Sequence, residues 1–298
     1  MSTTLNDVSA RIFSDALIAE GNTVLAPLRA FSLDLSKAVV KAKGATVEAT
    51  VFGATTAAAF NKTSNNYGHS QGSVRTVPVA MDTHIKDSFG VDDVKALESP
   101  VPYFTGAGKT HAQSIGAGIL STVFGLLTVA KYSQESVLTY ASIAKSNFAN
   151  LFKIATDNNI NPMEATLVLN SSYFAALLGL LDSATYGGSE AIRKGVVPGL
   201  FGFKSVTAAP SLPTAENLIG FLTTANAICV AGRYLQPQAP NAYEETGMAF
   251  DEVTGLTFGL RRLANGLTGE VVQTTEALFG YQEGDPKALV RLISAARA

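Results

Sequence analysis

The sequence predicts an α+β fold, in which helical and strand-forming segments are mixed without the regular alternation of a wound parallel sheet. Three observations carry this prediction. Residues 46–82 contain two strand-like legs joined by a long tip, residues 115–130 form an uncharged helical run, and residues 255–292 consist of short strand patterns separated by turn signals.

The two-legged segment is the most unusual part of the chain. Residues 46–51 alternate polar with apolar side chains, as a half-buried strand does, and residues 76–79 supply a return leg in which Pro78 marks an edge position. The tip, Gly53 to Val74, is too long for an ordinary connection inside a compact domain. Fully extended, one leg reaches about 50 Å, whereas the expected radius of gyration is about 19 Å. We therefore expect the arm to lie on a neighbouring molecule.

The segments on either side of the arm give weaker signals. Residues 1–45 show no long period and predict a partly extended arm. Residues 91–97 predict a short acidic helix that ends at the prolines after Ser99. Residues 106–110 are similar to a phosphate-binding loop, but Tyr103 stands where its first glycine is required, so a flexible lead-in to the next helix is expected.

A long helix is predicted at 113–132, with apolar residues such as Ile119 and Val123 on one face. Its uncharged core, 115–130, is shorter than the roughly twenty residues that cross a bilayer, so a helix lying across a sheet is expected instead of a membrane span.

The second half predicts a helix at 136–155, a break at 157–162, and a helix at 173–181 that Ser171 or Ser172 can cap at its N-terminus. Strands are predicted at 165–169, 202–206, 225–234, 255–261, 270–273 and 288–292.

The composition indicates that part of the surface of the protein is buried in contacts with partners. The formal net charge is -2 and the pI is near 6.0, so no nucleic acid or anionic membrane is required as a direct ligand. Only 15% of residues are charged, against about 25% in typical soluble domains. Charge depletion is characteristic of the centres of permanent interfaces. The single cysteine, Cys229, lies in an apolar run and is expected to be a small buried residue.

No catalytic, cofactor-binding or metal site is predicted. The histidines, His69, His84 and His111, share no metal-ligand spacing, and the serines at 171 and 172 lack the glycine elbow of a nucleophile. Two readings from other classes stay open at this point: a membrane-active protein that uses residues 115–130, and an enzyme whose site is assembled from residues distant in sequence.

The order of these parts resembles the major capsid protein of tailed double-stranded DNA bacteriophages, the Hong Kong 97-type fold. Residues 161–169 with 173–178 are similar to the axial strand and helix of that family. Residues 195–205, leading to Leu212-Pro213, are similar to its glycine-rich turn into a strand, and residues 255–280 resemble its closing strands. The resemblance covers most of residues 40–298 in order.

The resemblance implies five parts. These are an N-terminal arm (1–45), an extended loop (46–82), a peripheral domain with a spine helix (83–135), an axial domain (136–250) and return strands of the peripheral domain (251–298). It further implies a non-enzymatic shell of pentamers and hexamers that encloses phage DNA, with an encapsulin-type compartment around cargo enzymes as the alternative.

The implied inter-subunit contacts are Phe60 as an apolar anchor, with Lys62 and Arg75 as charge partners. Some family members carry an N-terminal scaffolding segment for which this chain has no room, so a separate scaffolding protein is expected. The other implied partners are a portal protein, a decoration protein and packaged DNA bound non-specifically, with no membrane. Location in the virion after assembly in the host cytoplasm, and non-covalent closure without a Lys62 cross-link, are also expected.

Overall fold

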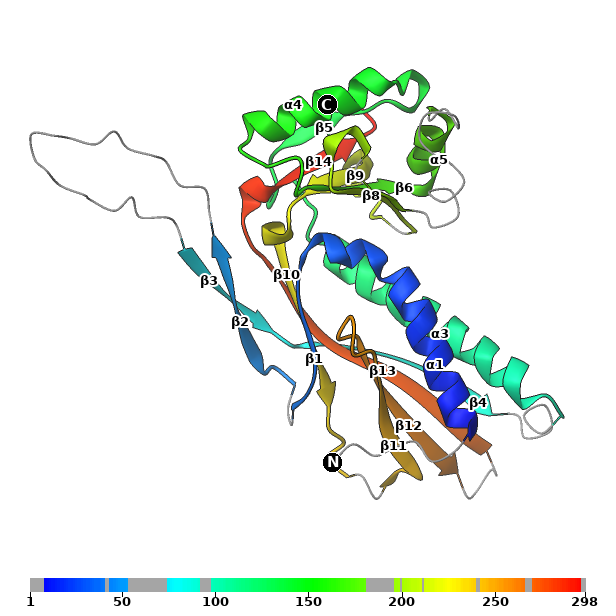
Figure 1. Ribbon diagram of the computed structural model, residues 1–298. Coiled ribbons are helices and arrows are strands. Elements are labelled where there is room, and N and C mark those ends of the chain that lie inside the picture. The colour runs from blue at the N-terminus through cyan, green and yellow to red at the C-terminus, as the bar shows by residue number, and fades with distance from the viewer. Residues whose placement is uncertain are drawn as a thin grey trace, which may run out of the picture.

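The computed structural model describes residues 8–40, 43–52, 74–91, 98–180, 196–198, 200–210, 212–239, 242–265 and 270–295. In these residues the chain forms two six-stranded sheets, a separate two-stranded hairpin, and helices that cover the sheets (Figure 1). The α+β class predicted from the sequence is confirmed.

The first sheet has the strand order β1-β10-β13-β12-β11, with β4 on the opposite edge of β13. Its strands are β1 (Ser32–Val40), β4 (Thr83–Val91), β10 (Ile228–Leu235), β11 (Glu245–Phe250), β12 (Thr257–Asn265) and β13 (Glu270–Glu283). The sequence predicts only the start of β13 and misses β4. Val91, expected to begin a short helix, ends β4 instead, and residues 92–97 lie outside the described residues.

Two helices, α1 (Val8–Val24) and α3 (Pro100–Phe124), run side by side over one face of this sheet (Figure 1). The expectation of a partly extended segment is therefore wrong for residues 8–24. Its helical period is hidden in the sequence because the buried face of α1 includes Ser14 and Gly21 beside Phe13 and Leu17.

Helix α3 begins and ends earlier than predicted. Pro100 stands in its first turn, where the missing N–H would be unsatisfied in any case, so this proline starts a helix that we expected it to stop. The presumed flexible lead-in at 106–110 lies inside the helix. A Cβ atom on Gly108 would stand 2.6 Å from the carbonyl oxygen of Phe13, so this glycine serves the close approach of α1 and α3.

The second sheet has the order β5-β14-β9-β6-β8-β7 and is flanked by α4 (Lys145–Asp157) and α5 (Ser171–Leu180). Its strands are β5 (Glu135–Val137), β6 (Thr166–Asn170), β7 (Val196–Pro198), β8 (Ser205–Ala209), β9 (Leu218–Thr223) and β14 (Leu289–Ile293). The described residues also contain short 3-10 helices: η1 (Ala26–Ala30), η2 (Tyr140–Ser142), η3 (Leu200–Gly202), η4 (Ala215–Asn217), η5 (Ala225–Ala227) and η7 (Pro286–Ala288).

Local predictions in this part are confirmed for β6 and for the break after α4, but two details are wrong. Residues 136–144 are not part of the predicted helix: residues 135–137 pair with β14 as a parallel strand, and the short 3-10 helix η2 (Tyr140–Ser142) precedes α4, which begins only at Lys145. The N-terminal cap of α5 is Asn170, whose Oδ1 accepts a hydrogen bond from the backbone N–H of Tyr173 at 2.9 Å, and not Ser171 or Ser172.

The chain crosses between the two sheets three times, along residues 125–134, 224–227 and 284–288. We call this region the waist. The crossings are joined by hydrogen bonds, since Ala227 O accepts from the Tyr132 hydroxyl at 2.7 Å and from Gly284 N at 2.8 Å. Strand β10 belongs to the first sheet and β14 to the second, so no single point of the chain separates the sheets.

Candidate assembly surface around the hairpin

The hairpin pairs β2 (Thr46–Phe52) with β3 (Val74–Ala80) in antiparallel register, from Thr46 opposite Ala80 to Phe52 opposite Val74. Both predicted legs are confirmed: residues 46–51, predicted from their alternating pattern, lie in β2, and the return leg 76–79 lies in β3. Apolar side chains of its inner face pack on the side of the first sheet that α1 and α3 leave free. The buried residues of this cluster are Val51, Val77, Val79, Met81, Cys229, Ala231 and Leu278.

The outer end of the hairpin is apolar and exposed. Phe52 and Val74, the last described pair before the tip, are 64% and 60% exposed. Phe60 and Lys62, two of the predicted contact residues, lie outside the described residues. The hairpin is thus anchored on its own subunit by one face, while it presents apolar side chains that its own subunit leaves uncovered.

Arg75, the third predicted contact residue, lies beside the waist. Its Nη1 donates to the carbonyl oxygen of Gly284 at 3.3 Å, and Asn226 Nδ2 donates to the carbonyl oxygen of Phe52 at the same distance. Both bonds tie the end of the hairpin to the crossings between the sheets. The position of Phe52 and Arg75 relative to the two sheets is therefore fixed by these bonds.

Cys229 lies under the hairpin and is 1% exposed, as expected for a small buried residue. Burial raises the pKa of its thiol, and the nearby Arg75 guanidinium opposes this shift. The thiol is thus protonated at neutral pH, which makes it a poor nucleophile.

A polar cleft of about 480 Å³ separates the end of the hairpin from the second sheet. It is lined by Phe52, Asn158, Asn159, Ile160, Asn161, Glu164, Lys204, Thr224, Ala225, Asn226, Asp285, Lys287 and Ala288. Charges of both signs and several amides face this space, which is the composition of a polar interface rim.

Two clusters of buried charged side chains link elements of the two sheets. Neither cluster was predicted from the sequence. Arg291 of β14 is fully buried and pairs with Glu135 and with Glu216, whose Oε2 also accepts from Val129 N at 3.1 Å. A lone arginine inside the apolar run of β14 was the available signal, because a buried arginine requires acidic partners.

The second group crosses three strands of the first sheet. Glu276 of β13 is 4% exposed, and its carboxylate accepts from Arg261 Nε of β12 at 2.7 Å and lies 3.0 Å from His84 Nε2 of β4. Arg261 also donates to the Tyr243 hydroxyl at 3.1 Å. His84, considered above as a metal-ligand candidate, is therefore a partner of Glu276.

Neither group forms a metal site: within the described ranges, no cluster of three or more histidine, cysteine, aspartate or glutamate side chains could hold an ion. In the same ranges, no helix has the length and apolar character needed to cross a membrane.

No known protein-family profile and no curated protein matches the sequence. The structure, in contrast, is similar to viral shells. The capsid of an empty GTA particle matches with a TM-score of 0.54 at 13% identity, over 92% of this chain and 97% of that chain. The capsid of the cyanophage P-SCSP1u matches with a TM-score of 0.54 at 11% identity, over 90% and 87%. A virus-like particle from Pyrococcus furiosus matches with a TM-score of 0.52 at 13% identity, over 93% and 96%.

Two sheets joined at a waist, a long helix across one of them and an anchored hairpin define an architecture that this chain shares with these capsid structures. More particularly, the chain has the Hong Kong 97-type fold of tailed-phage major capsid proteins, which matches over nearly its whole length. The fold predicted from the resemblance is confirmed.

Proposed function

We propose that the chain is a major capsid protein, which assembles into pentamers and hexamers of an icosahedral shell around packaged phage DNA. The observation that carries this proposal is the match to capsid subunits over most of both chains. The low charge content and the hairpin end, apolar and uncovered by its own subunit, support it independently. The protein is proposed to be structural and non-enzymatic, and to reside in the virion after assembly in the host cytoplasm.

The five-part division into arm, extended loop, peripheral domain, axial domain and return strands remains part of this proposal. The first sheet with α1 and α3 would form the peripheral domain, and the second sheet with α4 and α5 the axial domain. This assignment changes the expected bounds of the parts. Elements α1 and β1 pass from the arm (1–45) to the peripheral domain, β10 and β11 pass from the axial domain (136–250) to the peripheral domain, and β14 passes from the return strands (251–298) to the axial domain.

The arm would carry the contacts between neighbours. Phe60 and Lys62 are proposed to lie on an adjacent subunit, with Phe60 as the apolar anchor. Arg75 is exposed, and within the described residues one of its five N–H donors bonds the carbonyl oxygen of Gly284, so other donors are proposed to meet a carboxylate of the neighbour. A separate scaffolding protein, a portal protein and a decoration protein are the proposed further partners, with DNA held non-specifically because the chain is nearly neutral.

Replacement of residues 53–73 by Asn-Gly tests the role of the arm. Phe52 and Val74 are directly paired, so a two-residue turn can close the hairpin without disturbing its root. We expect a folded subunit with an unchanged melting temperature that forms no closed shells by negative-stain microscopy, with or without a co-expressed scaffold. Closed shells from this variant would contradict the proposed role.

The alternative function is an encapsulin-type compartment that encloses cargo enzymes. The similarity to a virus-like particle supports a shell in general and is compatible with this alternative. The contents of purified particles distinguish the two. Nuclease-protected DNA supports the phage capsid, whereas a co-purified protein cargo in particles free of DNA supports the compartment.

A further inference from the structure

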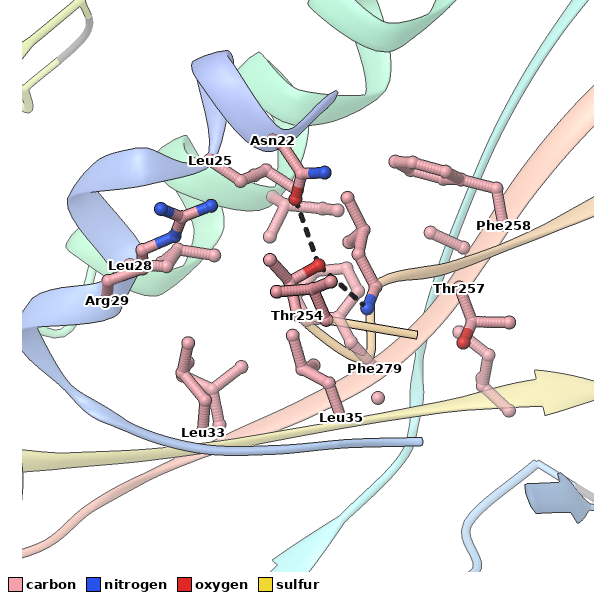
Figure 2. A pocket seen from close by; sticks show the side chains of 17 residues that line it. Asn22, Leu25, Leu28, Arg29, Leu33, Leu35, Thr254, Thr257, Phe258 and Phe279 are labelled. Atoms are coloured by element: carbon pink, nitrogen blue, oxygen red, sulfur yellow. Dashed lines mark hydrogen bonds between the residues drawn. The ribbon is translucent and has the colours of Figure 1, made fainter. Parts of the chain in front are cut away.

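A second apolar surface lies away from the hairpin, where α1 and η1 meet β1 and the first sheet. It contains a cavity of about 340 Å³ that opens between these elements, and Figure 2 shows leucine and phenylalanine side chains around it. The lining residues that matter here are Leu25, Leu28, Leu33, Leu35, Phe258 and Phe279. Most of its lining is apolar, so an apolar side chain that enters it would remove apolar surface from water. The cavity, which we also call the hole, therefore suits an apolar side chain better than it suits water.

The turn between β11 and β12 forms part of the rim of the cavity and carries one protruding apolar side chain, Val253, which we call the knob. Val253 is 93% exposed, although it lies on a strongly hydrogen-bonded turn. Asp251 Oδ2 accepts from the Thr254 hydroxyl at 2.6 Å and from Asn22 Nδ2 at 2.8 Å, and its Oδ1 accepts from Val253 N at 3.1 Å. These bonds lower the pKa of Asp251 to about 2.

The same turn is held at its far end by Gly255, which has a φ of +74° and whose N–H donates to Asp251 O at 2.8 Å. A Cβ atom there would lie 2.5 Å from the carbonyl oxygen of Leu35, so the turn packs directly on β1. The knob is thus preorganised, and little conformational freedom would be lost when it binds.

The charges around the knob and the hole are complementary. Glu252, next to the knob, and Arg29, on the rim of the hole, are both exposed. Among the described residues, neither has an oppositely charged group within salt-bridge distance. One surface thus carries a protruding apolar side chain (Val253), an apolar cavity, an acidic residue (Glu252) and a basic residue (Arg29). Such a surface is self-complementary, as a contact across a two-fold axis requires.

We propose that this patch is a two-fold contact between copies of the chain, in which Val253 of each copy enters the cavity of the other and Glu252 of each meets Arg29 of the other. The inference rests on the proposed function and adds a contact that the hairpin does not make. The occupant is a second copy because knob and hole adjoin on one surface.

A charge swap tests the contact. Glu252→Arg and Arg29→Glu each place like charges at the contact, so each single variant should raise the subunit concentration needed for assembly by about tenfold or more. The double variant should restore assembly. Both side chains are exposed, so the melting temperature of the free subunit should not change. Val101→Asp, at an exposed valine on α3, is the control for a new surface charge and should assemble normally.

A cross-link tests the geometry. Two chains in a Cys229→Ala background, one with Val253→Cys and the other with Leu33→Cys, are mixed and oxidised, so that any disulfide between the two positions is intermolecular. We expect a cross-linked dimer, and none when Val8→Cys, at the other end of α1, replaces the Val253 variant.

Shell formation by the unmodified chain is scored separately by microscopy. If it forms no shells, the proposed function fails, while the cross-link assay on the free chains still tests the patch. Shells without the cross-link, or single charge variants that assemble like the unmodified chain, would overturn the inference.

Discussion

Arg291 Nη2 lies 2.5 Å from Glu216 Oε2, although the arginine side chain is fully buried. The glutamate reaches this position from η4, where its own φ is +59°, in a region that non-glycine residues seldom occupy. The same carboxylate accepts a hydrogen bond from Val129 N in the connection that leaves α3. The buried Arg291 and its partner Glu216 thus connect β14, η4 and the first waist crossing.

Arg291→Met is expected to lower the free energy of unfolding by about 3–5 kcal/mol, because it leaves the carboxylates of Glu135 and Glu216 facing a site without their cation. Urea denaturation of the free subunit measures the change. The matched control is Lys153→Met, which removes an exposed pair with Asp157 and should change stability by less than about 0.5 kcal/mol. A loss at Arg291 no larger than that of the control would contradict the role assigned to the buried cluster.

Gly108→Ala is expected to destabilise the subunit by about 1–3 kcal/mol, because the new methyl group would overlap the backbone of α1. Gly106, one half-turn away in the same helix, has open space around it. Gly106→Ala should therefore stabilise the subunit by about 0.5–1 kcal/mol through better helix propensity. Thermal unfolding of both variants is the measurement. Equal effects of the two substitutions would argue against the close helix contact.

Asn170→Ala is expected to cost about 1 kcal/mol, because it removes the acceptor for Tyr173 N at the start of α5. Ser171→Ala, one residue later, should be nearly neutral. Chemical denaturation compares the two variants, and the reverse order of effects would restore the serine cap predicted from the sequence.

The free energy of unfolding is expected to fall as the pH drops through about 6.5. Burial lowers the pKa of His111, and Asp87, 3.8 Å from its Nδ1, opposes this only in part. The unfolded chain therefore binds a proton at a pH where the folded chain does not. The histidine ring packs on Phe13 and Phe89, so His111→Phe should retain the packing and reduce this pH dependence. Denaturation curves at pH 7.5 and pH 5.5 measure the difference, and a stability that rises on acidification would contradict the expected sign.

Short-range patterns carried much of the correct prediction. Alternating side chains in residues 46–51 specified β2, an apolar run specified β6, and the apolar neighbours of Cys229 predicted its burial, because each signal is complete within a few residues. The resemblance that led to the fold depended on the order of such parts along the chain.

Contacts between distant segments decided what these patterns left open. Helix α1 can pack closely on α3 because Gly108 has no side chain. Glu135 lies in a strand because β14 pairs with it. Arg291 can be buried because two glutamates from other segments form ion pairs with it. The sequence by itself determined which segments are strands or helices where one face is uniformly apolar. Tertiary structure decided the rest, since burial of small, polar or charged residues depends on partners far away in the chain.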